Sequence, residues 1–275
     1  LARHGQAEAV IVLGKATSAS DGFVAEELQR YLRKLSHAEV PIVTDDQLPA
    51  GKSLILLGGP LANPLSAAAQ ERQLVEFGGL KPDGFILKTI ELDGRAAIVV
   101  GGNDDAGTMY AAYELLERLG IVFHLTNDVI PEQKPDLALP ALDLRMEPMV
   151  KHRGIMADTG FSTWYMSLKD YRKTIDQLAK QKLNRFEFFV AMGSPWMGFS
   201  FEGVVADLNT SPESHYLAWE QWGRSPHSST TSASDVRVGR DIFPQDYVGP
   251  PEFDAVRTPE DARRTAREFL RELIR

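Results

Sequence analysis

The residues best suited to bind a ligand lie in or after two short apolar runs in the middle of the chain, 150–156 and 184–191. Trp164 follows the first run and Trp196 follows the second. An indole face in such a place can stack on the ring of a ligand, although a large aromatic side chain serves equally well in packing. His152, inside the first run, could face a site or be a satisfied core histidine. All three are candidate ligand-binding residues.

The pattern between the two runs predicts how these residues are positioned. Ser167 can cap a helix, with Asp170 three residues on, and apolar side chains then recur at helical spacing. The run 184–191 has the length and apolar character of a buried parallel strand. Strand, helix and strand make a β/α unit, and the C-terminal strand ends carry the chemistry in β/α barrels. We therefore predict the first β/α units of a TIM barrel in residues 149–275.

Residues 1–130 predict a separate domain, a small mixed α/β sandwich. Apolar and amphipathic patterns indicate its strands and two helices, at 9–14, 21–35, 40–43, 53–58, 83–92, 95–101, 104–119 and 121–125. The pair Asp93-Gly94 is a strong hairpin signal, and Gly120 suits the end of the second helix. The stretch 131–148 has four prolines and no periodicity, which predicts a linker.

The C-terminal part of the chain shows less pattern. Residues 192–256 have little periodicity, whereas 258–275 predict a helix with Thr258 as its N-cap and Pro259 at its first position. A barrel needs eight strands, each followed by a helix. Because the sequence indicates only the first of these units, we expect the N-terminal portion of a longer enzyme, with an incomplete barrel.

Composition argues against several classes of function. The 275 residues carry a net charge of −8, which disfavours nucleic acid or an anionic membrane as the main partner. No apolar run reaches the roughly 18–20 residues of a membrane span. There is no cysteine for a disulfide or a thiolate, and the six histidines lack zinc-ligand spacing. The compartment stays open, with bacterial export slightly favoured over the cytoplasm.

Motifs for nucleotide and ester chemistry are missing from the sequence. Gly14-Lys15 follows a predicted strand but lacks the upstream glycine and the Lys-Ser/Thr pair of a phosphate loop. No G-x-G-x-x-G follows a strand, and no G-x-S-x-G is present. We therefore expect neither a nucleotide cofactor nor a serine nucleophile.

Several motifs together resemble the region before the barrel in α-glucuronidases and β-N-acetylhexosaminidases. Residues 84–87 (GFIL), 101–110 (GGNDDAGTMY) and 116–120 (LERLG) are similar to the glycine-rich turn and helix of that domain. Residues 152–158 (HRGIMAD) resemble the motif that opens the hexosaminidase barrel, and 173–184 (KTIDQLAKQKLN) resemble the helix that follows. The resemblance covers nearly the whole chain.

The resemblance implies roles for individual residues. Arg153 matches a first-strand arginine that hydrogen-bonds sugar hydroxyls in hexosaminidases, and a guanidinium fork can hold two vicinal hydroxyls or a uronate carboxylate. The alternative is a structural ion pair with a carboxylate. Asp158 matches an aspartate that orients its neighbours, and capping the next turn is the favoured role. The predicted substrate-binding residues are thus Arg153, Trp196, Asp158, His152 and Trp164.

The implied activity is hydrolysis of a glycosidic bond in a carbohydrate substrate by two carboxyl groups, without metal or organic cofactor. Residues 184–192 (NRFEFFVAM) lack the two histidines and the aspartate of the hexosaminidase second strand, which favours an α-glucuronidase-like enzyme. The resemblance places the acid pair on a later strand, beyond Arg275, so the catalytic residues are unknown and the chain alone is expected to be inactive. The alternatives are a hexosaminidase-like enzyme and a non-catalytic carbohydrate-binding or scaffold protein, and a homodimer is left open.

Overall fold

The computed structural model describes residues 1–156, 168–187, 199–201, 204–206 and 259–274. The chain divides into two compact units. The first unit consists of Leu1–Arg153 and Gln177–Asn184, and the second consists of Gly154–Asp176 and Arg185–Arg275. Each unit is therefore built from two separate stretches of sequence.

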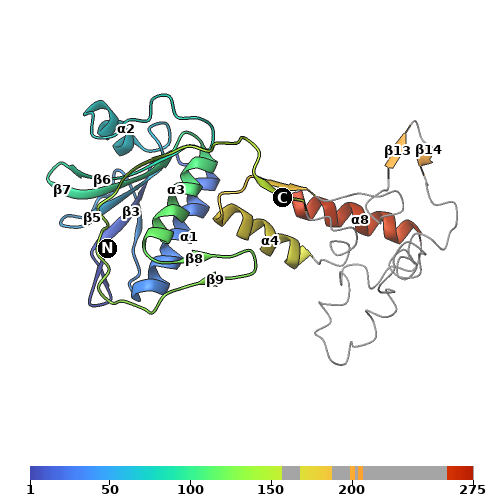
Figure 1. Cartoon of the computed structure of the whole chain (residues 1–275), viewed down its shortest axis with the longest axis horizontal. Coiled ribbons are helices and arrows are strands. Elements are labelled where there is room, and N and C mark those ends of the chain that lie inside the picture. The colour runs from blue at the N-terminus through green and yellow to red at the C-terminus, as the bar shows by residue number, and fades with distance from the viewer. Residues whose placement is uncertain (157–167, 188–198, 202–203, 207–258, 275) are drawn as a thin grey trace. The chain divides into compact units, whose positions relative to one another are not determined.

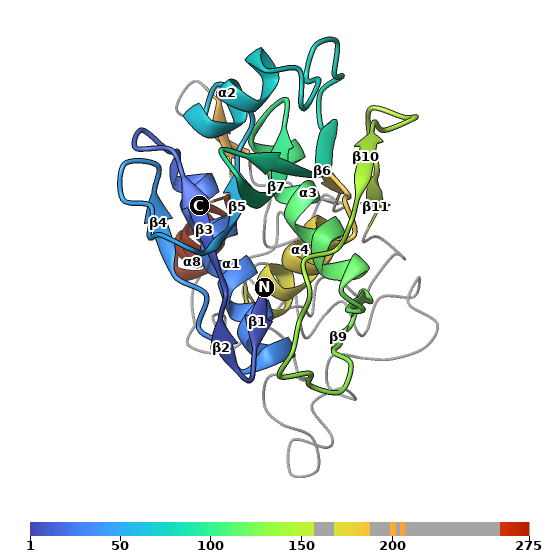
Figure 2. The same cartoon turned by 90° about the vertical axis from the view of Figure 1, so that its left-hand side faces the viewer.

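A mixed six-stranded sheet forms the centre of the first unit, in the order β10-β6-β7-β5-β3-β4 (Figure 2). Its strands are β3 (Ala9–Leu13), β4 (Ile42–Thr44), β5 (Ser53–Leu57), β6 (Phe85–Leu92), β7 (Arg95–Gly102) and β10 (Asp143–Met146). β3, β4, β5 and β7 run parallel, whereas β6 is antiparallel to β7 and to β10. The expected mixed α/β domain is confirmed, and β4 lies at an edge as its proline predicts.

The central strands are apolar on both faces because both faces of the sheet are covered. In β3, Ile11 and Leu13 belong to one hydrophobic cluster, while Val10 and Val12 belong to another. Alternate side chains of a strand point to opposite faces. A continuous apolar run is therefore what a strand buried on both sides requires.

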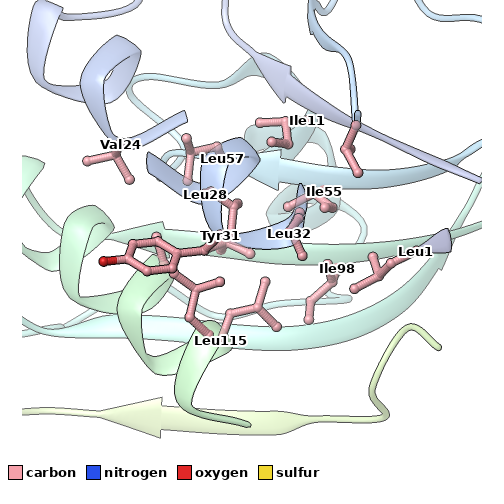
Figure 3. Close-up of a cluster of buried hydrophobic side chains, with 14 of the residues drawn as sticks. Leu1, Ile11, Val24, Leu28, Tyr31, Leu32, Ile55, Leu57, Ile98 and Leu115 are labelled. Carbon is pink, nitrogen blue, oxygen red and sulfur yellow. The ribbon is translucent and has the colours of Figure 1, made fainter. Parts of the chain in front are cut away.

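Helices α1 (Ala19–Ser36) and α3 (Asp105–Arg118) cover one face of the sheet (Figure 1). Their apolar stripes pack on β3, β5 and β7 in the larger hydrophobic cluster. Leu28, Tyr31 and Leu32 of α1 are fully buried there beside Leu115 of α3 (Figure 3). The two helices that the sequence predicts therefore share one core.

Local signals fix the ends of these elements. Ser18 and Asp104 cap α1 and α3, each accepting a backbone N–H three residues on, at 3.0 Å and 2.7 Å. The hairpin of β6 and β7 turns at Asp93-Gly94, where both residues have positive φ (52° and 73°), as a type I′ turn requires. Gly120 follows α3 with a φ of 105°. The turn at Asp93-Gly94 and the helix end at Gly120 that the sequence predicts are confirmed, whereas the N-cap roles of Ser18 and Asp104 were not predicted.

Several elements of the first unit were not expected. Helix α2 (Pro64–Glu71) begins after Asn63 and contributes Ala69 to the smaller cluster, on the opposite face of the sheet from α1 and α3. β10 lies inside the stretch 131–148, so the predicted linker contains an edge strand of the sheet. The short antiparallel pair of β1 (Ala2–Arg3) and β2 (Gln6–Ala7) was not expected either. β8 (Val122–Phe123) lies within the strand predicted at 121–125, but its antiparallel partner β9 (Asp128–Val129) was not predicted.

The second unit contains a parallel strand pair, β11 (Gly154–Met156) and β12 (Arg185–Glu187). Its other elements are the start of α4 (Leu168–Lys180), a hairpin of β13 (Phe199–Phe201) and β14 (Val204–Ala206), and α8 (Pro259–Ile274). Tyr171 of α4 is buried edge-to-face against Phe186 and Phe269, with ring centroids 5.8 Å apart in both pairs.

The strand–helix–strand order and the two helices are as expected, while a barrel stays a prediction. The expected caps Ser167 and Thr258 lie outside the described residues. Among the residues that the structure describes, no helix combines the length and apolar character needed to cross a membrane.

Candidate functional site

Two of the five predicted substrate-binding residues, His152 and Arg153, are described, whereas Asp158, Trp164 and Trp196 lie outside the described residues. The run 150–156 becomes a strand only at Gly154. His152 and Arg153 therefore directly precede β11, at its N-terminal end. In a barrel that end of a strand contributes to stability, and the opposite end carries the chemistry.

Arg153 is held by protein acceptors. Its Nη2 lies 2.9 Å from Oδ2 of Asp83, and both side chains are only 16% exposed. Its Nε donates to the carbonyl of Lys182 at 3.0 Å, and its Nη1 donates to the carbonyl of Val150 at 3.0 Å. The guanidinium also lies 5.7 Å from the ring centroid of Tyr110. These are the contacts of the structural alternative, and sugar binding by Arg153 stays a prediction.

Asn184 completes a three-residue cluster with Arg153 and Asp83. Its Oδ1 accepts the backbone N–H of Arg153 at 2.9 Å, and its Nδ2 donates to Oδ2 of Asp83 at 2.7 Å and to the carbonyl of Lys151 at 2.8 Å. The backbone N–H of Asn184 donates to the carbonyl of Arg153 at 2.8 Å. The Asp83 cluster (Asp83, Arg153 and Asn184) thus joins the residue before β11 to the residue before β12.

Lys182, two residues after the end of α4, connects this segment to helix α3. Its Nζ lies 3.1 Å from Oε2 of Glu114 and also pairs with Glu117. Glu114 in turn pairs with Arg118 at 2.7 Å. Burial would raise the pKa of Glu114, but the hydrogen bonds and charges of Arg118 and Lys182 outweigh burial and lower it. Two carboxylates of α3 therefore hold one lysine.

Asp128 of β9 connects the end of α4 to helix α1. Its Oδ2 lies 3.1 Å from Nζ of Lys180, its Oδ1 accepts from Nε2 of Gln177 at 3.0 Å, and the Tyr31 hydroxyl donates to it. Burial would raise the pKa of Asp128, but these hydrogen bonds and the Lys180 charge lower it. Burial and the hydrogen bond to Asp128 raise the pKa of Tyr31. We call Gln177, Lys180 and Lys182, with their acidic partners, the α4 anchor.

The glycine-rich motif serves close packing of the backbone. A Cβ on Gly102 would lie 2.3 Å from the carbonyl carbon of Gly107, and a Cβ on Gly107 would lie 2.4 Å from the carbonyl oxygen of Gly84. Such distances leave no room for any side chain. At Gly14, a Cβ would lie 1.9 Å from the carbonyl oxygen of Ala62. The turn after β3 therefore also requires glycine for close backbone packing.

A pocket of about 600 Å³ lies beside the Asp83 cluster, and we call it the His152 pocket. It is lined by Lys81, Pro82, Asp83, Pro148, Met149, Lys151, His152 and Asn184. Its residues come from the loop before β6, from the segment before β11 and from the turn between α4 and β12. Of these, only His152 was predicted from the sequence as a binding residue, and Asn184 ends the motif 173–184 without a predicted role. The others carry no local signal, because contacts across the fold bring the segments together.

A second pocket, of about 720 Å³, lies beyond the C-terminal ends of β5 and β7. The helices after these strands cover opposite faces of the sheet, and such a divergence is the usual ligand position in open α/β sheets. Asp104, which lines it, already accepts the backbone N–H groups of Gly107 and Asp83. Within the described part of the chain, no group of three or more His, Asp or Glu side chains is placed to hold a metal ion.

Comparison with known proteins identifies the first part of the chain. Residues 2–115 match the family described as glycosyl hydrolase family 67 N-terminus. A β-hexosaminidase of Porphyromonas gingivalis is 27% identical over 117 residues, which are 42% of this chain and 14% of that protein. Residues 2–115 are thus similar to a glycoside hydrolase N-terminal domain, and the resemblance found in the sequence is confirmed.

Solved structures extend the comparison. A family GH115 4-O-methyl-α-glucuronidase with specificity for decorated arabinogalactans aligns with 100% of this chain and 40% of its own, at 18% identity and a TM-score of 0.52. This likeness shows the fold alone. A β-hexosaminidase of Streptomyces plicatus, in complex with GlcNAc, aligns with 67% of this chain and 30% of its own, at 17% identity and a TM-score of 0.42. The chain thus spans well under half the length of these relatives.

Proposed function

We propose that this chain is the N-terminal portion of an α-glucuronidase-like glycoside hydrolase. The match of residues 2–115 to the glycosyl hydrolase family 67 N-terminus carries the proposal. The hexosaminidase second-strand histidines and aspartate are missing from 184–192, which favours a uronic acid over an N-acetylhexosamine as the sugar that is released.

The chemistry of the proposed reaction is acid/base hydrolysis by two carboxyl groups, about 5–5.5 Å apart for retention or about 6.5–9.5 Å apart for inversion of the anomeric centre. The resemblance puts this pair on a strand later than β12, beyond Arg275. The described residues contribute support, because the Asp83 cluster holds the residues from which β11 and β12 start. No catalytic role is assigned to any of them.

The test begins with the intact mass of the protein isolated from its source, since the printed chain alone has a mass of 30.5 kDa. That form is then assayed with an aryl α-glucuronide, a 4-O-methylglucuronic acid-bearing oligosaccharide and an aryl β-N-acetylhexosaminide. We expect a larger mass and release of the uronic acid, and we expect no turnover by the 275-residue chain.

The 27% identity to a β-hexosaminidase favours that enzyme as the second candidate. Release of N-acetylhexosamine without release of a uronic acid would establish the second candidate and reject the first. A larger protein that binds these sugars but hydrolyses neither would instead be a non-catalytic carbohydrate-binding protein. Turnover by the 275-residue chain would show that the carboxyl pair lies within it.

A further inference from the structure

The His152 pocket carries basic side chains in an acidic protein. Lys81, Lys151 and His152 line it, although the whole chain has a net charge of −8. The ammonium of Lys81 lies 3.8 Å from Oε2 of Glu147, and the Lys81 side chain is 67% exposed. In the part of the chain that the structure describes, the side chains of Lys151 and His152 are exposed and have no hydrogen-bonding or ion-pair partner. A local excess of positive charge favours an anionic ligand.

Asp83, the only carboxylate among the described residues that line the pocket, is already neutralised. Oδ2 of Asp83 accepts hydrogen bonds from Nη2 of Arg153 at 2.9 Å and from Nδ2 of Asn184 at 2.7 Å. The described residues donate no hydrogen bond to its Oδ1. An anion in this pocket therefore meets little repulsion from Asp83, and Oδ1 can accept a hydrogen bond from a neutral hydroxyl group.

The rest of the wall is apolar. Met149 is 100% exposed, and Pro82 and Pro148 lie with it in the pocket lining. A fully exposed methionine beside two prolines offers a flexible, polarisable surface for a ring. The pocket thus combines donors for an anion, one acceptor for a hydroxyl and an apolar side.

We propose that the His152 pocket is a binding site for a uronic acid residue of a glycan. Lys151 and His152 bind the carboxylate, Oδ1 of Asp83 accepts a ring hydroxyl, and Met149 covers one face of the sugar. A volume of about 600 Å³ falls in the range of small-ligand sites. The choice of a sugar as the ligand rests on the proposed function.

Other anions fit the pocket less well. A phosphate ion could pair with the basic side chains, but it would leave the apolar wall of Pro82, Pro148 and Met149 without a partner. A neutral sugar would leave the two unpartnered basic side chains unused. A carboxylate on a ring uses both the basic and the apolar sides.

The test is calorimetric titration of the 275-residue chain with methyl α-D-glucuronoside and, in parallel, with methyl α-D-glucoside. We expect measurable heat of binding from the glucuronoside. The glucoside should bind about tenfold more weakly, because it has no carboxylate for Lys151 and His152 to bind. Lys151→Met keeps the apolar stem and removes the charge, and it should weaken glucuronoside binding about fivefold. Met149→Ser should weaken both sugars.

Lys15→Met is the matched control, because Lys15 is an exposed lysine of the same unit that pairs with Asp46 at 3.2 Å and does not line the pocket. Equal binding of the two sugars would overturn the proposal, as would displacement by acetate as strong as by the glucuronoside. So would equal effects of Lys151→Met and Lys15→Met. If the protein isolated from its source binds the glucuronoside in the His152 pocket but hydrolyses no glucuronide, only the proposed function is rejected. If it hydrolyses glucuronides but does not bind the glucuronoside in this pocket, only the proposed binding site is rejected.

Discussion

Replacing the Asp83 carboxylate should loosen the connection between the segments that precede β11 and β12. Asp83→Asn keeps the shape of the side chain and suits the φ of 63° at this position, because asparagine tolerates left-handed backbone. What it removes is the negative charge opposite Arg153. The substitution therefore tests the contribution of the ion pair without disturbing the backbone conformation at this position.

The expected loss follows from burial. Breaking a fully buried pair costs about 3–5 kcal/mol, but Asp83 and Arg153 are each 16% exposed and the guanidinium keeps its carbonyl acceptors. A hydrogen bond to a charged group contributes about 1.5–3 kcal/mol, and the amide oxygen of asparagine still accepts. We therefore expect a loss of about 1.5 kcal/mol for Asp83→Asn, and about 1 kcal/mol more for Asp83→Ala, which places alanine in the left-handed region.

Hydrogen exchange measures this change locally. The N–H of Asn184 donates to the carbonyl of Arg153 at 2.8 Å, and the expected loss should speed its exchange about tenfold. Asp93→Asn is a matched control, since Asp93 also has positive φ (52°) and pairs with an arginine, Arg72, but with 67% of its side chain exposed. The control should change exchange by less than about twofold. Equal effects of the two substitutions would refute the reasoning.

Two further predictions concern packing and pH. Gly102→Ala puts a Cβ 2.3 Å from the backbone of Gly107 and should cost more than about 3 kcal/mol or prevent folding. Gly22→Ala, inside α1 with nothing within 4 Å of its Cβ, should stabilise by about 0.5–1 kcal/mol, and thermal unfolding measures both. The pKa of Asp128 is lowered in the fold, so its contribution is present above its ordinary pKa of about 4 and is lost as pH falls through the lowered value. Asp128→Asn should therefore flatten the acid side of a plot of melting temperature against pH, and an unchanged slope would contradict this.

Local patterns were enough for most of the first unit. The helix end at Gly120 and the turn at Asp93-Gly94, which were predicted, depend on the residues there and their near neighbours, as do the N-caps Ser18 and Asp104, which were not predicted. Period and capping therefore predict them without knowledge of the fold. Such signals place the elements but not the contacts that they make.

The missed elements had weaker signals. β10 has four residues, of which Asp143 and Arg145 are exposed and only Leu144 and Met146 turn inward. Among prolines, so short an alternation does not stand out, and its place at the sheet edge comes from pairing with β6. For α2 a usable signal existed, since Asn63-Pro64 is an N-cap followed by proline at the first helical position.

The contacts of the candidate site were beyond sequence reasoning, because they join distant segments. Asp83 and Arg153 are 70 residues apart, and Asp83 and Asn184 are 101 apart. No periodicity links an aspartate before one strand to an arginine before another. The resemblance found Arg153 and the stretch ending at Asn184, but the partner of both, Asp83, becomes visible only in the fold.

In the structure, the motifs that carried the resemblance make contacts that join distant segments of the chain; we call these contacts joints. Gly102 and Gly107 allow two backbones to touch, Arg153 and Asn184 share Asp83, and Lys182 binds the carboxylates of α3. A protein that builds the same joints needs these side chains whatever sugar it binds, so the motifs report architecture more than substrate. Sugar preference must then come from residues outside these contacts, and in the first unit our proposal assigns Lys151, His152 and Met149 to sugar binding.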